Sequence, residues 1–135
     1  MGPSAAVKSC FRKYATFSGR ASRSEFWWFL LFAEICAGVQ MILLTALGEF
    51  SANRISDGTS ARDVCAEVLY SVVVLGVFPP MISATVRRAH DRDCPGKWCL
   101  IYFVPFGSIW LLVSFCRRGT AGDNRFGPDP LAESR

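Results

Sequence analysis

Four arginines in two short polar segments are the residues of this chain best suited to bind an anion: Arg20, Arg23, Arg87 and Arg88. The first two precede a long apolar run and the other two follow a second such run. Guanidinium groups present paired donors that match phosphate oxygens, so the four could together bind an anionic lipid headgroup. The alternative, which we favour, is that they anchor the chain at the membrane interface and have Glu25 and Asp91 as internal partners.

His90 and Asp91 are adjacent in the sequence and suggest acid–base chemistry. Neighbours in sequence need not face one another, however, and no serine or cysteine nucleophile lies in a recognisable catalytic motif. We therefore do not expect an enzyme. The six cysteines show no CxxC spacing and His90 is the only histidine, so we expect neither a zinc site, nor a disulfide framework, nor a cofactor.

Glu34 is the one carboxylate of the first apolar run. Because a charged side chain at the centre of a membrane helix costs roughly 2.5–3.5 kcal/mol, it should face protein or water. Small and polar residues recur on its side of a helix, which is typical of close helix packing: Glu34, Ala37, Gly38, Met41 and Thr45. Glu34 is therefore either a proton or cation site or, as we favour, a protonated acid that is hydrogen-bonded to a neighbouring helix.

Three apolar runs, at 26–47, 64–86 and 98–116, must position these groups. Hydrophobic residues make up 51% of the chain and charged residues 19%, against roughly 25% charged in soluble domains. At about 1.5 Å per residue the first run is about 33 Å long, enough to cross a hydrocarbon layer of about 30 Å. It is also too long for the core of a signal peptide. The predicted fold is all-α, an integral membrane bundle of about three transmembrane helices.

Prolines interrupt the second and third runs, at Pro79-Pro80 and at Pro105. Proline lacks a backbone donor, so it kinks or breaks a helix. For the second run we favour a single kinked span over a re-entrant hairpin. The polar stretch 48–63 is predicted to be an exposed loop.

The segments outside the spans have their own signatures. In residues 1–25, the stretch Ala5–Tyr14 is either a short amphipathic helix in the headgroup layer or a partly ordered tail. Ser22 and Glu25 fit a capping box at the start of the first span. The tail, 117–135, is predicted to be extended along the membrane surface. Its polar groups could dock onto the loop around His90 only if the tail returns to that side.

The distribution of basic residues predicts the orientation. With three spans, the N-terminal side carries more lysine and arginine than the other side, and the positive-inside rule then places the N-terminus in the cytoplasm. The side of the tail is left open. The net charge of +4 indicates anionic lipid headgroups as partners rather than nucleic acid.

Three motifs in series resemble those of a family of small bacterial inner-membrane proteins, domain-of-unknown-function family 805. They read GRASRSEFW at 19–27, RRAHD at 87–91 and NRFGPDP at 124–130. The last comprises Asn124, Arg125, Phe126, Gly127, Pro128, Asp129 and Pro130. The match runs from about Tyr14 to Pro130, and the chain departs from the family pattern at Cys94-Pro95-Gly96-Lys97. The resemblance implies a multi-pass protein of the bacterial inner membrane and brings no activity with it.

Two functions remain as hypotheses. The first is a structural or interaction module that associates with itself or with a larger membrane complex, as the short chain and the small-residue face suggest. The alternative is transport or the handling of anionic lipids, with Glu34 in a polar cavity and the arginine cluster on the anion.

Overall fold

The structure, a computed structural model, describes residues 1–52 and 61–132, and these are helical without a named strand. In chain order they form α1 (Pro3–Arg12), α2 (Arg23–Ala52), α3 (Ala61–Asp91), a 3₁₀ helix η1 (Gly96–Phe103) and α4 (Gly107–Cys116). The predicted all-α class is confirmed. Of the predicted loop 48–63, the first residues continue α2, the last ones begin α3, and residues 53–60 lie outside the described residues.

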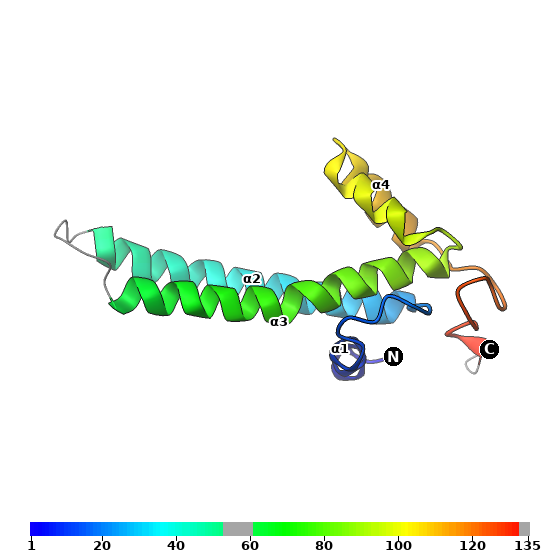
Figure 1. The fold of residues 1–135 in the computed structure, drawn as a ribbon, viewed down its shortest axis with the longest axis horizontal. Helices are drawn as coiled ribbons and strands as arrows, with labels where there is room; N and C mark the ends of the chain where they lie inside the picture. Colours follow the sequence, from blue (N-terminus) through cyan, green and yellow to red (C-terminus); the bar gives the residue numbers. More distant parts are fainter. Residues whose placement is uncertain (53–60, 133–135) are drawn as a thin grey trace.

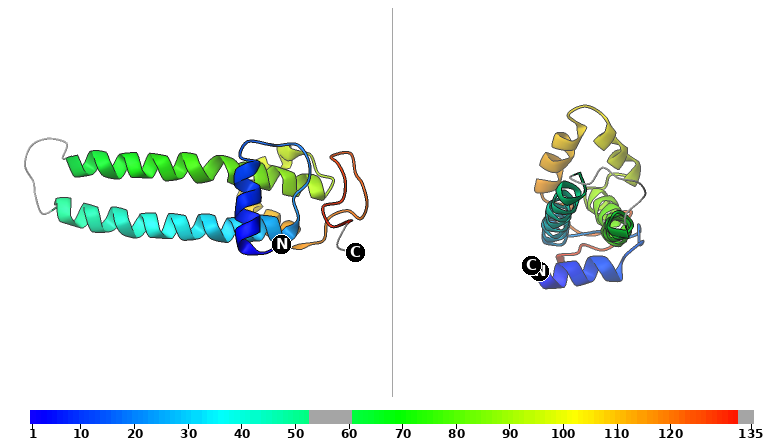
Figure 2. Two further views of the ribbon diagram at one scale, coloured as in Figure 1. Left: turned by 90° about the horizontal axis from the view of Figure 1, so that it is seen from below. Right: turned by 90° about the vertical axis from the view of Figure 1, so that its left-hand side faces the viewer.

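The two long helices α2 and α3 run antiparallel and side by side for most of their length (Figures 1 and 2). Both are long and apolar enough to cross a membrane, over Arg23–Ala46 and Val64–Asp91. In their most apolar stretches only 11% and 6% of the residues are buried, whereas the core helix of a soluble protein would be covered. The apolar side chains therefore face outward, as in a protein whose solvent is lipid.

α3 continues as one helix through Pro79 and Pro80. Pro79 has no amide to offer the Leu75 carbonyl, four residues earlier. The hydroxyl of Tyr14 donates to that carbonyl instead. Ser83, which is fully buried, donates to the carbonyls of Thr16 at 2.6 Å and Lys13 at 3.1 Å. The segment after α1 thus supplies a donor to the carbonyl that Pro79 releases and acceptors to the Ser83 hydroxyl, and the helix is not broken.

The third apolar run differs from the predicted third span. It is divided between η1 and α4, which form a hairpin that rises from the end of α3 and returns to the same end (Figure 1). Phe106 has the left-handed φ of 63° between the two helices. A Cβ at Gly107 would lie 1.8 Å from the Ile101 carbonyl oxygen, so only glycine permits this approach. Pro105-Phe106-Gly107 is therefore a reversal, and among the described residues two helices rather than three have the length of a span.

α1 lies across α2 and α3 at the same end, on the side opposite to the hairpin (Figure 2). Compared with the predicted stretch Ala5–Tyr14, α1 begins two residues earlier and ends two residues earlier. Cys10 from α1, Phe29 from α2 and Ala84 from α3 form one buried cluster. Phe26, Ala89, Leu111 and Phe115 form a second cluster that joins α2, α3 and α4. The buried core thus lies at one end of the long helix pair.

Candidate functional site: a buried arginine centre

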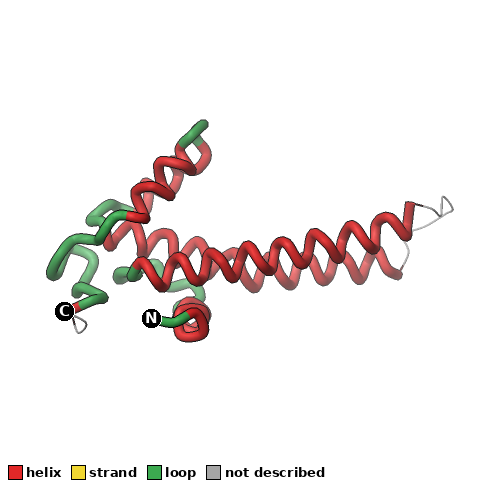
Figure 3. The backbone as a smooth tube through the Cα atoms, turned by 180° about the vertical axis from the view of Figure 1, so that it is seen from behind, coloured by secondary structure: helices red, strands yellow, loops and turns green. Residues whose placement is uncertain are grey.

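The two termini and most of the loops gather at this same end of the molecule (Figure 3). We call the assembly of α1, residues 13–25, the end of α3 and the tail from Arg117 the polar cap. Among its largest fully buried side chains are two arginines, Arg87 and Arg88. Buried arginines require partners, and the polar cap supplies them.

Asp91 is the centre of one ion-pair cluster. Its Oδ1 lies 2.9 Å from Nε and from Nη2 of Arg20, and its Oδ2 contacts Nη1 of Arg88. All three side chains are at least 95% buried. Arg20 also donates to the Thr120 and Gly122 carbonyls of the tail, at 2.6 Å each. The Arg20–Asp91 ion pair therefore connects the first motif, the second motif and the tail.

Arginines also satisfy the end of α4, whose last carbonyls have no intrahelical partner. Arg88 Nη2 donates to the Phe115 carbonyl at 2.7 Å, Arg92 Nη1 to that of Ser114 at 2.9 Å, and Arg23 Nη1 to that of Cys116 at 3.4 Å. A helix C-terminus also carries a partial negative charge, which cations stabilise. The hairpin is thereby fixed to the helix pair by the guanidinium groups of Arg88 and Arg92, and the exposed Arg23 adds only a long contact.

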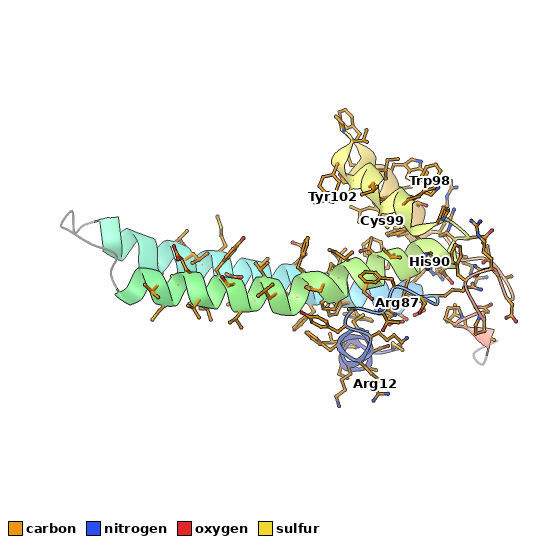
Figure 4. The ribbon with its side chains drawn as sticks, in the orientation of Figure 1. Arg12, Arg87, His90, Trp98, Cys99 and Tyr102 are labelled. Atoms are coloured by element: carbon orange, nitrogen blue, oxygen red, sulfur yellow. The ribbon has the colours of Figure 1, made fainter. Side chains whose placement is uncertain are left out.

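Arg87 belongs to a separate cluster on the α1 side (Figure 4). Its Nη1 lies 2.8 Å from Glu25 Oε1, which also accepts from Ser9 Oγ at 3.0 Å and lies 3.6 Å from Lys13 Nζ. Ser22 Oγ accepts from the Glu25 amide at 3.2 Å, the first half of the predicted capping box. The Glu25 carboxylate faces Arg87 and Ser9 instead of closing the box. Adjacent residues of α3 thus serve two different centres, and the four predicted arginines do not form one cluster.

Cys10 lies beside this second cluster, with its Sγ 3.9 Å from Glu25 Oε1. Burial, and then the neighbouring Glu25 carboxylate, raises the pKa of the thiol to about 11. At neutral pH the thiol is protonated and unreactive, which fits the predicted packing role of this cysteine.

The tail returns to the polar cap and docks on the loop around His90. Asn124 Nδ2 donates to the His90 carbonyl at 2.9 Å, and Arg125 Nε lies 2.9 Å from Asp93 Oδ1. The rings of Phe126 and His90 stack with centroids 3.9 Å apart and nearly parallel planes. His90 Nδ1 also lies 3.2 Å from the Gly19 carbonyl oxygen. The tail is therefore packed against protein, in turns with one isolated β-bridge between Asn124 and Gly127, rather than extended along a surface.

The rest of the tail motif shapes these turns. Asp129 is buried and accepts from the Gly122 amide at 3.3 Å and the Leu131 amide at 3.0 Å. Gly127 adopts a φ of +133°, which favours glycine, and Pro128 and Pro130 are exposed on either side of Asp129. Residues 133–135 of the predicted tail lie outside the described residues.

Glu34 belongs to neither cluster, and α3 leaves its predicted packing face uncovered. Every member of that face is exposed in the single chain, with Met41 at 66%. Gln40 is instead the buried polar residue of this part of α2. Sequence reasoning missed Gln40, and it also missed Arg92 and Arg118 as site residues. The pair Arg117-Arg118, immediately after the third apolar run, was the available signal.

Two long outward-apolar helices and a charged cap at one end define a small helical membrane protein. Residues 14–128 match the model of a family described as "Protein of unknown function (DUF805)", and the chain belongs to that family. It is 37% identical to the inner membrane protein YhaI and 36% identical to the inner membrane protein YhaH, both of Escherichia coli K12. Each alignment covers 90% of this chain and 92% or 93% of the relative. No solved structure matches the chain significantly. The protein is thus a bacterial inner-membrane protein.

Proposed function

We propose that this protein is an interaction module of the inner membrane that pairs with a second copy of itself through the Glu34 face of α2. The observation that supports the proposal is the exposure of Glu34 on a membrane-spanning helix. A carboxyl group in hydrocarbon is costly, so it faces a protein partner or water. Within the single chain neither Ala37, Gly38 nor Met41, on the same face, is covered.

A second copy suits this face because the face is self-complementary. A two-fold axis along the membrane normal brings residues of equal depth together. A protonated carboxyl group is both donor and acceptor, so the two copies of Glu34 satisfy one another. The small side chains at Ala37 and Gly38 let the two α2 backbones approach closely. The Asp91 carboxylate and the Nδ1 atom of His90 are engaged inside the polar cap, and we propose no catalytic role for either residue.

Disulfide crosslinking in native membranes tests the pairing. In a cysteine-free background, Ala37→Cys is expected to form a crosslinked dimer on mild oxidation, because the two Ala37 positions lie close to the axis. Val39→Cys is the matched control: it is at similar depth and exposed, but lies on another side of α2. Equal crosslinking at both positions, or none at Ala37→Cys, would contradict the proposal.

Glu34→Gln is expected to keep the dimer and Glu34→Val to weaken it.

The orientation that fits this fold has the polar cap in the cytoplasm, with α2 and α3 crossing the membrane and the η1–α4 hairpin entering and leaving from the cytoplasmic side. Only Arg54 and Arg62 of the 15 basic residues fall between α2 and the apolar part of α3 in the sequence. This asymmetry is larger than the one a three-span arrangement gives, and the positive-inside rule places the basic end in the cytoplasm.

Topology reporters separate the two-crossing arrangement from the three-span arrangement. A reporter fused before Met1 and one fused after Arg135 are both expected to report the cytoplasm, and one inserted between α2 and α3 the periplasm. A periplasmic signal from the fusion after Arg135 would restore a third crossing and overturn the re-entrant arrangement.

A further inference from the structure

The polar cap contains a cavity of about 200 Å³ between the start of α2, the end of α3 and the tail. Its charged walls are four guanidinium groups and two carboxylates: Arg20, Arg23, Arg88, Arg118, Asp91 and Asp129. We propose that this cavity, the arginine pocket, binds a phosphate-bearing anion, either the headgroup phosphate of an anionic phospholipid or free phosphate. The site is independent of the Glu34 face.

The charged side chains of the arginine pocket differ in how many partners they have within the chain. Arg20 and Arg88 share Asp91 and are almost fully buried. Asp129 is used by backbone amides of the tail. Arg23 is exposed and makes one long hydrogen bond, 3.4 Å to the Cys116 carbonyl, and Arg118 is exposed without an ion pair or hydrogen bond among the described residues. Two guanidinium groups are thus available to bind a ligand. The net charge of the walls is positive, because four arginines line the pocket and only two aspartates do.

The ligand class follows from size and geometry. Pockets for drug-sized ligands have volumes of about 300–1,000 Å³, so a cavity of about 200 Å³ suits a small anion or a single headgroup. Guanidinium forks bind phosphate oxygens in pairs with short, charge-assisted hydrogen bonds. Arg23 also begins α2 four residues before Trp27, and tryptophans favour the headgroup depth of a membrane. A lipid phosphate is therefore within the same layer as the pocket.

The backbone of the tail is adapted to close this pocket. A Cβ at Gly119 would lie 2.0 Å from Asp91 Oδ2, so glycine alone lets the tail pass over the ion-pair cluster. Thr120, the next residue, donates its amide to the Asp91 carbonyl at 2.9 Å. The pocket is thus built from all three polar motifs and the residues that lead into the last one.

Binding to the purified full-length protein tests the proposal, with short-chain phosphatidylglycerol and inorganic phosphate as separate probes and short-chain phosphatidylcholine as the zwitterionic comparison. Arg23→Gln/Arg118→Gln is expected to weaken binding of the preferred probe at least tenfold, since each substitution removes a charge-assisted contact. Arg12→Gln, an exposed arginine of α1, is the control and is expected to leave affinity unchanged. Arg118→Lys is expected to lose part of the affinity, because it keeps the charge without the fork.

The two probes distinguish the source of the anion. Preferential binding of phosphatidylglycerol, lost in the double variant, assigns a lipid headgroup, and binding of inorganic phosphate with the same loss assigns the free anion. Both results support the pocket. Absence of binding by either probe, or binding that Arg23→Gln/Arg118→Gln leaves unchanged, overturns it. Because both arginines are exposed, the double variant should keep the unfolding midpoint of the original chain, and this measurement separates lost binding from lost folding.

Discussion

Replacement of Arg88 by alanine is expected to lower the free energy of unfolding by about 3–5 kcal/mol, the loss typical of breaking a buried ion pair. The Arg88 side chain is 0% exposed. Its removal leaves Asp91 with Arg20 as its one charged partner in the described part of the chain and leaves the Phe115 carbonyl without its donors. It also opens a cavity at the junction of α3 and α4. Unfolding in mixed micelles, followed by tryptophan fluorescence, measures the change.

Two controls give this prediction its specificity. Arg88→Lys keeps a positive charge, but a single ammonium group cannot contact both Asp91 and the Phe115 carbonyl in fork geometry, so an intermediate loss is expected. Arg12→Ala changes an exposed arginine and is expected to stay within about 0.5 kcal/mol of the original chain. If Arg88→Ala also stayed within that range, the hairpin would not depend on the guanidinium contact.

At the Glu25–Arg87 pair, each single substitution is expected to lower the free energy of unfolding, and the double substitution is expected to restore it. Arg87→Met leaves the buried Glu25 carboxylate with Ser9 and the half-exposed Lys13, and Glu25→Leu leaves a buried guanidinium, so each costs about 3–5 kcal/mol. Arg87 Nε and Nη2 are buried without a hydrogen-bond partner among the described residues. Because the pair is incompletely satisfied, Glu25→Leu/Arg87→Met is expected to recover nearly all of the lost stability.

The rate of alkylation of Cys10 measures these stability changes at the polar cap itself, in variants from which the other cysteines have been removed. The thiol is 0% exposed, so it reacts when the polar cap opens. A loss of about 3 kcal/mol raises the opening population, and hence the rate, by about a hundredfold. Arg87 lowers the pKa of this thiol, so Arg87→Met by itself would raise the pKa and slow the reaction. Faster alkylation in Arg87→Met therefore reports opening, and a double variant as fast as Arg87→Met would refute the cycle.

Local signals in the sequence were sufficient for the two long helices α2 and α3 and for the first turn of α2. The long apolar runs correspond to α2 and α3, and Ser22 caps α2 where the Ser-x-x-Glu spacing indicates. These features depend on residues within a few positions of each other, which a single sequence displays directly.

The third apolar run was not predictable in the same way. Pro79-Pro80 and Pro105 are similar interruptions in sequence, yet the chain continues through the first and reverses at the second. What separates them is non-local: Tyr14 serves the carbonyl that Pro79 releases, whereas Gly107 approaches Ile101 closely. The reversal in turn places the tail with the other motifs, which a three-span arrangement does not provide.

Helical periodicity also has a limit that Glu34 and Arg87 illustrate. A face of small residues around Glu34 predicts packing but does not say whether the partner belongs to the same chain. Arg87 and Arg88 are adjacent, and successive helical positions point about 100° apart, so they reach Glu25 and Asp91 respectively. Treating them as one cluster ignored that rotation.

The hydroxyl of Tyr14 at the Leu75 carbonyl has a consequence for biosynthesis. The two residues are 61 positions apart, so the N-terminal segment is synthesised and waiting well before α3 exists. A carbonyl without a donor is expensive in hydrocarbon. The donor that a continuous α3 needs at Pro79 is therefore already part of the chain when α3 is made.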